Sequence, residues 1–317
     1  MVKIIGLVVI SDRQMSRRMT VKLLKARDAA HAFSIIEKLT FQERLHYIFR
    51  GQQQRKWRLT TTLSRHFLSP YQPMTSIEFN EMLSHFFTRL AVIGVQLPFR
   101  NDKHEYRAQL EFGRHYGVPS PVVDFSYSPY IALFFAFNGV RPSEARATDY
   151  SCLYCVNIEA VAEVWARDSL LGRIDDYTIK RERMRFLYGD NGVVEDDTFE
   201  NGYKAERLRF MSVPASWNRR MQRQIGCFIY DSLCYPSTRY EDLEHYLEQD
   251  EVPTHLPSGQ VMLTKLMIPH KAGREIFERL DLMSINGTLL FDSHEGAAMD
   301  VINSYSYGRS SGLAWDI

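Results

Sequence analysis

The 317-residue sequence has few cysteines and no apolar run long enough to cross a membrane. Its four cysteines, Cys152, Cys155, Cys227 and Cys234, are too few and too unevenly spaced for a disulfide scaffold of this size. We therefore expect a cytoplasmic protein without a membrane partner. The apolar run Ile4 to Ile10 is far shorter than the roughly 20 residues of a membrane span. It predicts a strand, and a secretory signal is the alternative because Lys3 precedes the run.

The sequence also lacks a strong charge excess and the common nucleotide-binding loops. A net charge of +1 gives the whole molecule no strong attraction to nucleic acid or membrane. Neither G-x-x-x-x-G-K-[ST] nor G-x-G-x-x-G occurs, which argues against P-loop hydrolysis of nucleotides and against a Rossmann dehydrogenase. Cys152-x-x-Cys155 has no second pair at zinc-site spacing, so we expect no metal.

What is present is an ordinary globular composition with intermixed helices and strands, which predicts an α+β fold. Apolar spacing predicts helices over residues 28–39, with Asp28 as N-cap, and over 77–91, 129–137 and 271–283. Strands are expected at 47–52, 152–158, 226–230, 261–268 and 288–291. We divide the chain into a lead-in (1–43), one main domain (44–300) and a C-terminal tail (301–317) that is loose or docks late.

The strand expected at 47–52 ends in a candidate binding residue. Arg50 is predicted at its exposed end, and Gly51 is predicted to permit an unusual turn. Trp57 and Leu59 are then expected to return to the core.

Residues 114–129 form the densest cluster of aromatic, turn and hydroxyl residues in the chain. A glycine and three prolines are expected to fix a loop there. Asp124, Ser126 and Ser128 supply hydrogen-bonding groups just before a helix N-terminus, which suits an anionic or hydroxyl-rich ligand. Alternatively, Asp124 or Ser126 serves only as the cap of that helix.

The segment 201–223 is basic, with six cations against Glu206 and therefore a net charge of +5. Phe210 and Trp217 are interleaved with these cations, so the segment is where we expect a nucleic-acid substrate to approach. A solvated basic face is the alternative. The candidate nucleic-acid-binding residues are Lys204, Arg207, Arg209, Arg219, Arg220 and Arg223.

Several short blocks, taken in order, resemble the FRG-domain family. They are Phe49-Arg50-Gly51-Gln52, Trp57-x-Leu59, Leu63-x-Arg65, residues 114–129, Asn218-x-Arg220-Met221-x-x-Gln224-x-Gly226-x-Phe228, and residues 267–291. The likeness runs from about Tyr47 to Gly296. The chain departs from the family pattern where Arg114 stands in place of the usual glutamine, and where Ser120 to Ser126 stand in place of the usual Thr-Arg-Leu-Leu-Asp-Trp-Thr, so that Pro121 replaces an arginine.

The resemblance implies a distant member of the ADP-ribosyltransferase superfamily, with a split-sheet α+β core that binds NAD. Matched residue by residue, it implies catalytic positions at Arg50, Ser126 and Gln224, with Gln222 beside the last. Gln224 carries no charge, so Glu295 is a candidate for the missing acid. The implied NAD contacts are Arg50, Gly51, Gln52, Arg65, Tyr116, Asp124, Ser126 and Ser128.

The function that the resemblance implies is NAD-dependent mono-ADP-ribosyl transfer to a nucleic acid, with RNA favoured over DNA. Transfer to a protein, NAD hydrolysis without an acceptor, and a non-catalytic nucleotide-binding interaction module are the alternatives. Such an enzyme would injure its own cell, so the resemblance further implies a toxin or antiviral defence effector restrained by an antitoxin protein.

Overall fold

The computed structural model describes residues 21–42, 46–67, 76–100, 106–141, 146, 149–169, 175–188, 208–211, 216–231, 243–248 and 261–307. The strand expected at residues 4–10 lies outside the described residues, as do Cys234, Lys204 and Arg207.

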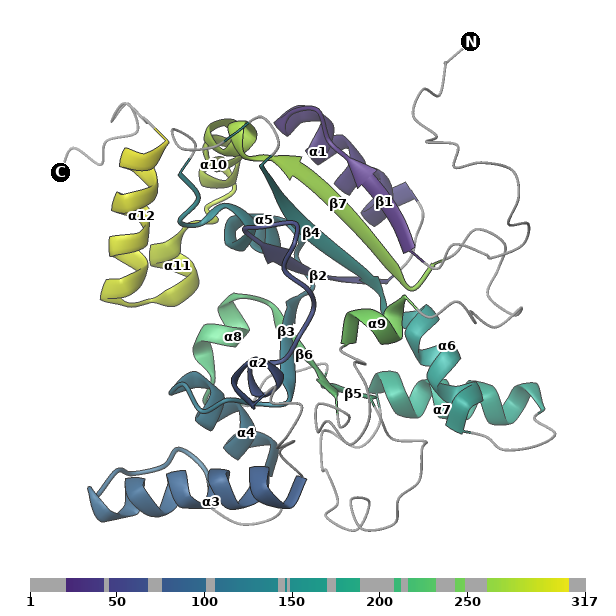
Figure 1. The fold of residues 1–317 in the computed structure, drawn as a ribbon, viewed down its shortest axis with the longest axis vertical. Helices are drawn as coiled ribbons and strands as arrows, with labels where there is room; N and C mark the ends of the chain where they lie inside the picture. Colours follow the sequence, from purple (N-terminus) through teal and green to yellow (C-terminus); the bar gives the residue numbers. More distant parts are fainter. Residues whose placement is uncertain are drawn as a thin grey trace.

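A seven-stranded sheet runs through the molecule in the order β1-β7-β4-β2-β3-β6-β5 (Figure 1). The strands are β1 (Val21–Lys25), β2 (Tyr47–Gln52), β3 (Val122–Ser126), β4 (Tyr150–Asn157), β5 (Leu208–Met211), β6 (Gly226–Asp231) and β7 (Leu263–Pro269). β1 and β7 are parallel, and the other neighbours are antiparallel. Strands and helices are intermixed, so the α+β class is confirmed.

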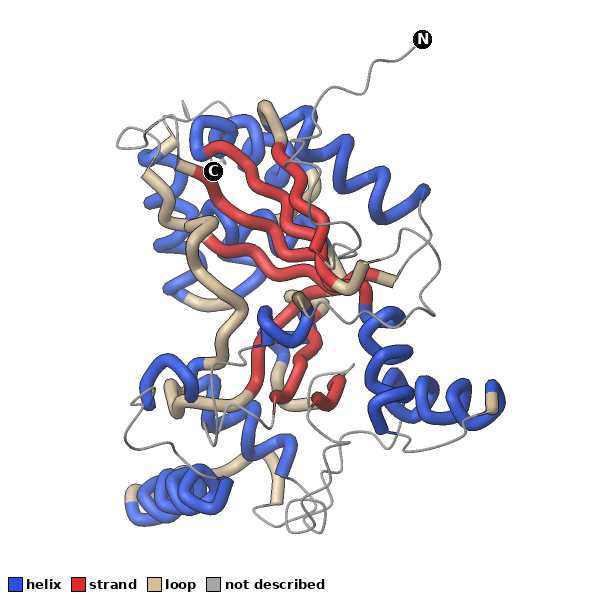
Figure 2. Tube along the Cα trace, turned by 45° about the vertical axis from the view of Figure 1, so that its right-hand side comes forward, coloured by secondary structure: helices blue, strands red, loops and turns tan. Residues whose placement is uncertain are grey.

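The sheet divides into two halves between β2 and β3. β2 pairs with β4 from Tyr47 to Gln52, but it pairs with β3 only at Phe49 and Ser126. Strands β1, β7, β4 and β2 therefore form one half, and β3, β6 and β5 form the other. Figure 2 shows the two sets of strands running in different directions.

Helices cover both halves of the sheet. They are α1 (Ala29–Glu37), α2 (Thr62–Phe67), α3 (Ser76–Val92), α4 (Tyr106–His115), α5 (Pro129–Phe137), α6 (Ile158–Ser169), α7 (Asp176–Tyr188), α8 (Arg219–Arg223), α9 (Leu243–Leu247), α10 (Gly273–Leu282), α11 (Gly287–Phe291) and α12 (His294–Ser306). A π-helical turn (Lys38–Gln42) follows α1, and a 3-10 turn (His270–Ala272) precedes α10. α1, α5 and α10 share one apolar core, α6, α7 and α9 a second, and α3 and α4 pack on β3 and β6 in a third.

Side-chain caps define the helix starts that the sequence predicted. Asp28 accepts a hydrogen bond from the backbone N–H of His31 at 2.8 Å, so α1 begins where expected. Ser128 caps α5 by accepting from the N–H of Ile131 at 3.3 Å. The helix cap is therefore Ser128, and neither Asp124 nor Ser126 serves that purpose because both lie on β3.

Two local predictions from the sequence are wrong. The loop expected across 114–129 contains a strand, β3, because its apolar residues fit between β2 and β6. The strand expected at 288–291 is helix α11, where Asn286 accepts from the N–H of Leu289 at 3.0 Å and so starts a helix. Short apolar runs fit either structure, and the cap decides between them. Of the expected tail, residues 301–306 belong to α12, and residues 308–317 lie outside the described part, so the prediction of a loose or late-docking tail stays a prediction.

The chain ends of the predicted main domain take part in the same fold. β1, from the lead-in, pairs with β7 along its whole length. α12 crosses the boundary expected at residue 300 and is followed by buried Tyr307, whose hydroxyl donates to the carbonyl of Phe137 at 2.8 Å. None of the described helices is long and apolar enough to span a membrane.

Candidate functional site

A cavity of about 980 Å³ lies where the two halves of the sheet meet. β2, β3, α4, α5, α8 and the segment after β2 contribute to its walls. Six cations line it against two carboxylates, Glu111 and Asp124, which gives a local charge of +4 where the whole chain has +1. Such a concentration of guanidinium and ammonium groups favours an anionic ligand. The cations are Arg50, Lys56, Arg58, Arg65, Arg114 and Arg220.

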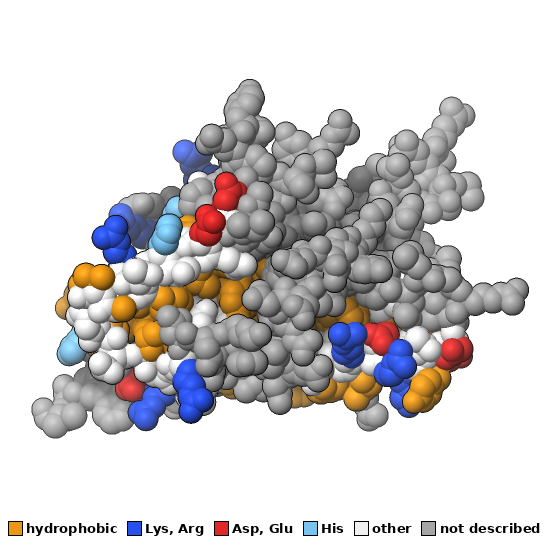
Figure 3. Space-filling view, turned by 90° about the horizontal axis from the view of Figure 1, so that it is seen from below, with side chains coloured by type: hydrophobic (Ala, Val, Ile, Leu, Met, Phe, Trp, Pro, Cys, Tyr) orange, Lys and Arg blue, Asp and Glu red, His pale blue; other side chains and the backbone are white. Residues whose placement is uncertain are grey.

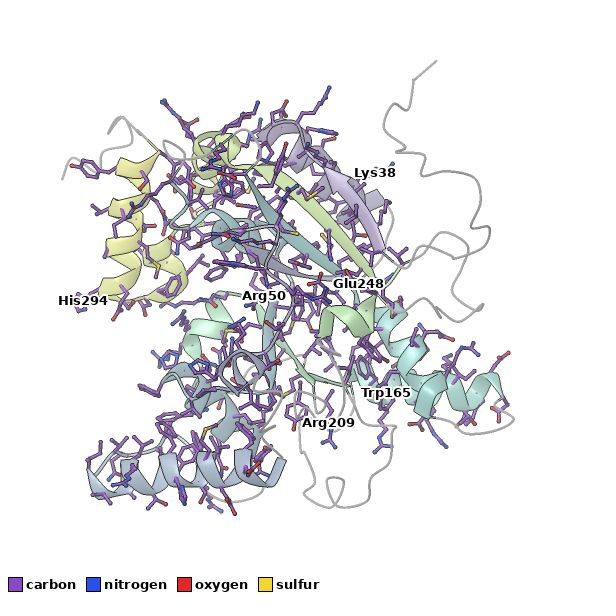
Figure 4. The ribbon with its side chains drawn as sticks, viewed as in Figure 1. Lys38, Arg50, Trp165, Arg209, Glu248 and His294 are labelled. Carbon is purple, nitrogen blue, oxygen red and sulfur yellow. The ribbon has the colours of Figure 1, made fainter. Side chains whose placement is uncertain are left out.

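Arg50 lies near the middle of the molecule (Figure 4) and lines the cavity from β2. Its Nη1 donates to the carbonyl oxygen of Asp124 at 2.7 Å and lies 3.7 Å from the carboxylate Oδ2. Its Nε is buried and has no hydrogen-bond partner among the described residues. Burial lowers the pKa of the guanidinium to about 10, so it remains charged at neutral pH. A charged donor in this position can bind a ligand oxygen.

The prediction that Arg50 lies at an exposed strand end before a glycine turn is wrong. The side chain is only 21% exposed, and β2 continues through Gly51 to Gln52, which pairs with Cys152. A Cβ atom at Gly51 would lie 1.8 Å from the carbonyl oxygen of Ala132 and 2.6 Å from the nitrogen of Ala136. Glycine is therefore present so that α5 can approach β2 closely.

Asp124 links Arg50 to Arg114. Arg114 binds the carboxylate through two nitrogens, with Nε donating to Oδ1 at 2.5 Å and Nη2 donating to Oδ2. Burial alone would raise the pKa of this carboxyl group, but Arg114 and Arg50 lower it below its usual range. Asp124 is thus ionised at neutral pH and orients two guanidinium groups in the cavity.

Ser126 and Gln224 meet in the same cavity although 98 residues separate them. The hydroxyl of Ser126 donates to the carbonyl oxygen of Gln224 at 2.7 Å and accepts from the N–H of Ser128 at 3.0 Å. The buried amide of Gln224 donates from Nε2 to the carbonyl of Leu290 at 3.5 Å. Arg50, Ser126 and Gln224, from three distant segments, therefore line one space.

Other residues implied by the resemblance divide into two groups. Gly51, Gln52, Arg65 and Asp124 line the cavity, whereas Tyr116, Ser128, Gln222 and Glu295 are not among its lining residues.

Each of the four residues outside the lining has a structural setting of its own. Tyr116 is 63% exposed and packs on Phe112, with ring centroids 4.6 Å apart. Gln222 is exposed and donates to the carbonyl of Ser216 at 3.0 Å. Glu295 lies in the exposed first turn of α12, where a hydrogen bond with Ser293 lowers its carboxyl pKa. Ser128 is the cap of α5.

The described arginines of the basic segment lie in two places. Arg219, Arg220 and Arg223 are on α8, where Arg220 lines the cavity and packs over the ring of Phe291. Arg223 pairs with Asp292 at 2.8 Å. Arg209 lies on β5 and pairs with Tyr230 of β6. Tyr230 is four residues beyond the start of β6, a distance of roughly 13 Å at 3.3 Å per residue. Figure 4 places Arg209 well below Arg50.

The sequence interpretation missed the segment of residues 53–60, called the rim segment below. Its residues Gln53, Lys56, Trp57, Arg58 and Thr60 all line the cavity. Trp57 was expected in the core, but 43% of it is exposed, whereas Leu59 is fully buried as expected. The available signal was the tripeptide Lys56-Trp57-Arg58, in which two cations flank an aromatic residue.

Both carboxylates that line the cavity have partners within the protein. Asp124 is held by Arg114 and Arg50, as described above. Glu111 accepts from Nδ2 of Asn218 at 2.9 Å and from Nε of Arg107 at 3.2 Å. Among the described lining residues, these are the two side chains that could stabilise a developing cation by charge.

The three described cysteines, Cys152, Cys155 and Cys227, are buried in the sheet. Cys152 and Cys155 lie on β4 but face different apolar cores, so the two thiols lie on opposite sides of the sheet. Burial raises the pKa of the Cys152 thiol to about 12. Within the described ranges, no three His, Cys, Asp or Glu side chains come together in a way that could hold a metal ion.

Comparison with known proteins bears on the first part of the site. Residues 45–145 match the family model described as the FRG domain, and no curated protein or solved structure matches the chain. The matched range holds Arg50, Arg114, Asp124 and Ser126, while Gln224 lies beyond it. The match therefore supports the similarity to the FRG-domain family over residues 45–145.

Proposed function

We propose that this chain is an NAD-dependent mono-ADP-ribosyltransferase that modifies nucleic acid, with RNA favoured over DNA. The observation that carries the proposal is the presence of Arg50, Ser126 and Gln224 in one cationic cavity. These are the three positions that the resemblance to ADP-ribosyltransferases assigns to NAD. The three residues come from β2, β3 and the end of α8, so their positions in the sequence do not by themselves bring them together.

The size and charge of the cavity suit a dinucleotide. Ligand pockets commonly measure roughly 300–1,000 Å³, and this one, at about 980 Å³, is large enough for two linked nucleotides. Arg50 and Arg65 can share the charge of a pyrophosphate, because guanidinium groups bind phosphate oxygens bidentately.

The proposed reaction breaks the bond between the anomeric carbon of the ribose and the nicotinamide nitrogen. Nicotinamide leaves with the electron pair, an acceptor oxygen or nitrogen bonds to the anomeric carbon, and the acceptor loses its proton. The polar groups of the cavity act by holding the dinucleotide in position while positive charge develops on the ribose. Ser126 keeps one acceptor lone pair for a ribose hydroxyl, since its hydroxyl donates to Gln224 and accepts once from Ser128.

A second candidate, a nucleotide-binding module without turnover, is favoured by one observation. Asp124 and Glu111 are both engaged by basic or amide groups, and the third motif position holds the neutral Gln224. A module of this kind would bind NAD in the same cavity and release it unchanged.

The two candidates are separated by incubating the full chain with NAD labelled in its adenylate part, together with RNA, DNA or cell protein. We expect label on nucleic acid, more on RNA than on DNA, and none with Arg50→Ala. Arg274→Ala is the control, because Arg274 is exposed on α10 and pairs with Glu278. Label on protein alone, or free ADP-ribose without a labelled acceptor, selects the corresponding alternative enzyme. Bound NAD that is never consumed selects the module.

We extend the proposal to a toxin or defence effector held in check by an antitoxin protein, and the support for this step is the resemblance alone. Induced expression of the wild-type chain should arrest bacterial growth, and Arg50→Ala should relieve the arrest at equal protein level. Equal growth of cells with either chain would contradict this extension.

A further inference from the structure

The backbone of the rim segment is fixed to the sheet. The N–H of Arg55 donates to the carbonyl of Tyr150 at 2.9 Å, and the hydroxyl of Tyr154 donates to the carbonyl of Trp57. The N–H of Leu59 donates to Oε2 of Glu244 at 2.8 Å, a carboxylate whose side chain is 4% exposed and pairs with Lys265. A segment anchored at these points holds its side chains in a defined place on the cavity wall.

Trp57 is not used by this anchoring, because only its backbone takes part. Trp57 lines the cavity, lies between Lys56 and Arg58 in sequence, and is 43% exposed. A single exposed aromatic residue is not by itself evidence of a binding site. Here it adds a flat apolar surface to a cavity lined by cations. This combination suits a nucleotide, because the ring can stack on a base while the cations bind the phosphates.

Gln52 supplies a second, independent observation. It lines the same cavity, is 6% exposed, and its Nε2 donates to the carbonyl of Arg58 at 3.2 Å, which places the amide beside the rim segment. Its Oε1 is buried without a hydrogen-bond partner among the described residues. An acceptor left in this state is stabilised when a ligand N–H group reaches it.

We propose that Trp57 is the surface on which a heteroaromatic ring of the ligand stacks, and that Oε1 of Gln52 accepts a hydrogen bond from an N–H group of that ligand. Nicotinamide, with its carboxamide, and adenine, with its amino group, both have this chemistry. The inference rests on the proposed function for the identity of the dinucleotide, but the ring site itself requires only a nucleotide ligand.

Calorimetric titration of the full chain with NAD, nicotinamide mononucleotide and AMP tests the proposal. Trp57→Leu should bind NAD about 10- to 100-fold more weakly, as expected for loss of one base–aromatic stack. Trp57→Phe, which keeps an aromatic face, should stay within about threefold of wild type. Tyr177→Leu is the matched control, since Tyr177 is a highly exposed aromatic residue on α7, outside the cavity. Only one of the two mononucleotides should lose affinity with Trp57→Leu, and it identifies the ring.

The proposal is overturned if Trp57→Leu binds NAD like wild type, or if Trp57→Phe binds NAD as weakly as Trp57→Leu. It is also overturned if Trp57→Leu loses affinity for both mononucleotides equally, or if the wild-type chain binds none of the three probes. Gln52→Leu should weaken the same mononucleotide as Trp57→Leu, and an unchanged affinity would remove the role given to Oε1. Failure of the proposed function has a different signature, in which no ADP-ribose is transferred or released although nucleotide binding still depends on Trp57.

Discussion

Arg50, Asp124 and Arg114 form the best-defined group of charged side chains in the cavity. Asp124 pairs with both guanidinium groups: Arg114 binds its carboxylate through two nitrogens, and Arg50 donates to its backbone carbonyl and lies 3.7 Å from the carboxylate. The family pattern has glutamine at position 114 and arginine at 121, and this chain has Arg114 and Pro121. Residue 121 carries no charge in this chain, and Arg114 is the residue that provides Asp124 with a bidentate guanidinium partner.

The pairing of Asp124 makes stability depend on acid pH. The pKa of this carboxyl is lower in the folded chain than in the unfolded one, so the stabilisation is present above the unfolded value of about 3.9 and is lost as pH falls through the folded value. Urea unfolding from pH 6 to pH 3 should show a smaller loss of stability in Asp124→Asn than in wild type. At pH 7 the variant should be less stable by roughly 1–3 kcal/mol, because two arginines lose their partner. Parallel pH curves would contradict the assignment.

Arg50 is expected to act through its planar geometry as well as its charge. Arg50→Lys keeps a cation but cannot bind a carbonyl, a carboxylate and a phosphate in one plane. NAD affinity, measured by calorimetry, should fall at least about tenfold, the result of losing one charge-assisted hydrogen bond. The melting temperature should change little, because Arg114 still pairs with Asp124. Wild-type affinity in Arg50→Lys would show that Arg50 does not hold the ligand.

At the scale of elements, the close contact between α5 and β2 depends on Gly51. Gly51→Ala places a methyl group 1.8 Å from the carbonyl oxygen of Ala132, so the helix and the strand must separate. We expect a loss of about 3 kcal/mol or more in urea unfolding, at the upper end of overpacking effects. Gly94→Ala is the comparison, because its Cβ meets nothing within 4 Å and only the positive φ of 73° opposes it. Equal losses in the two variants would show that α5 yields easily.

Glu244 connects α9 to the rim segment, β4 and β7. Its carboxylate accepts from the N–H of Leu59 and from Nζ of Lys265, and it lies 3.3 Å from the hydroxyl oxygen of Tyr154. Glu244→Gln should cost roughly 1–3 kcal/mol of stability because these buried donors lose a charged acceptor. It should also weaken binding of the ligand that stacks on Trp57. Glu248 is more exposed than Glu244, so Glu248→Gln should have a smaller effect on both stability and ligand affinity. Calorimetry and urea unfolding of both variants provide the test, and a ligand affinity untouched by Glu244→Gln would argue that the rim segment keeps its place without it.

Local sequence signals predicted elements well where they were unambiguous. The cap Asp28 and the apolar patterns of α3 and α5 predicted helices in the right places. β3 was missed because prolines and hydroxyl residues surround five residues whose strand form depends on pairing with β2 and β6. α11 was taken for a strand because four apolar residues fit either structure, and tertiary packing with α12 is not visible in sequence.

At the scale of the whole molecule, the cations of the cavity are a local feature. The net charge is +1, and in the view from below (Figure 3) basic and acidic side chains are mixed over the described surface. The cavity, by contrast, has six cations and two carboxylates. Total charge therefore gave no sign of an anion site, and only the fold brings these cations together.

The candidate site was predictable only in part for the same reason. Arg50, Ser126 and Gln224 were found because motifs mark them, and the fold places them in one cavity. The exposure of Trp57 could not be predicted, because the rim segment is held by Glu244, which is 185 residues from Leu59 in sequence. The resemblance implied Tyr116 as an NAD contact, yet its ring packs on Phe112 and the residue is not among those that line the cavity.

The position of α8 predicts that nucleic-acid modification and NAD turnover can be separated. Arg220 lines the cavity from α8, while its neighbour Arg219 is exposed and lies outside the lining. An RNA strand that places its acceptor group at the cavity would pass this helix, and Arg219 would contact a phosphate. Arg219→Glu should therefore reduce RNA labelling about tenfold at near-physiological salt, as one lost and one repelled phosphate contact predicts. NAD affinity should stay within about twofold, since Arg219 does not line the cavity.

The matched control is Arg274→Glu, which reverses another exposed charge, on α10. If both reversals reduce labelling to the same extent, the effect comes from the overall charge of the protein. If Arg219→Glu lowers NAD affinity and RNA labelling in parallel, α8 contributes to the dinucleotide site and the acceptor approaches elsewhere. Arg209 then becomes the next residue to reverse, because it is the described arginine of the basic segment that is not on α8. It lies on β5 opposite Tyr230, roughly 13 Å along β6 from the start of that strand.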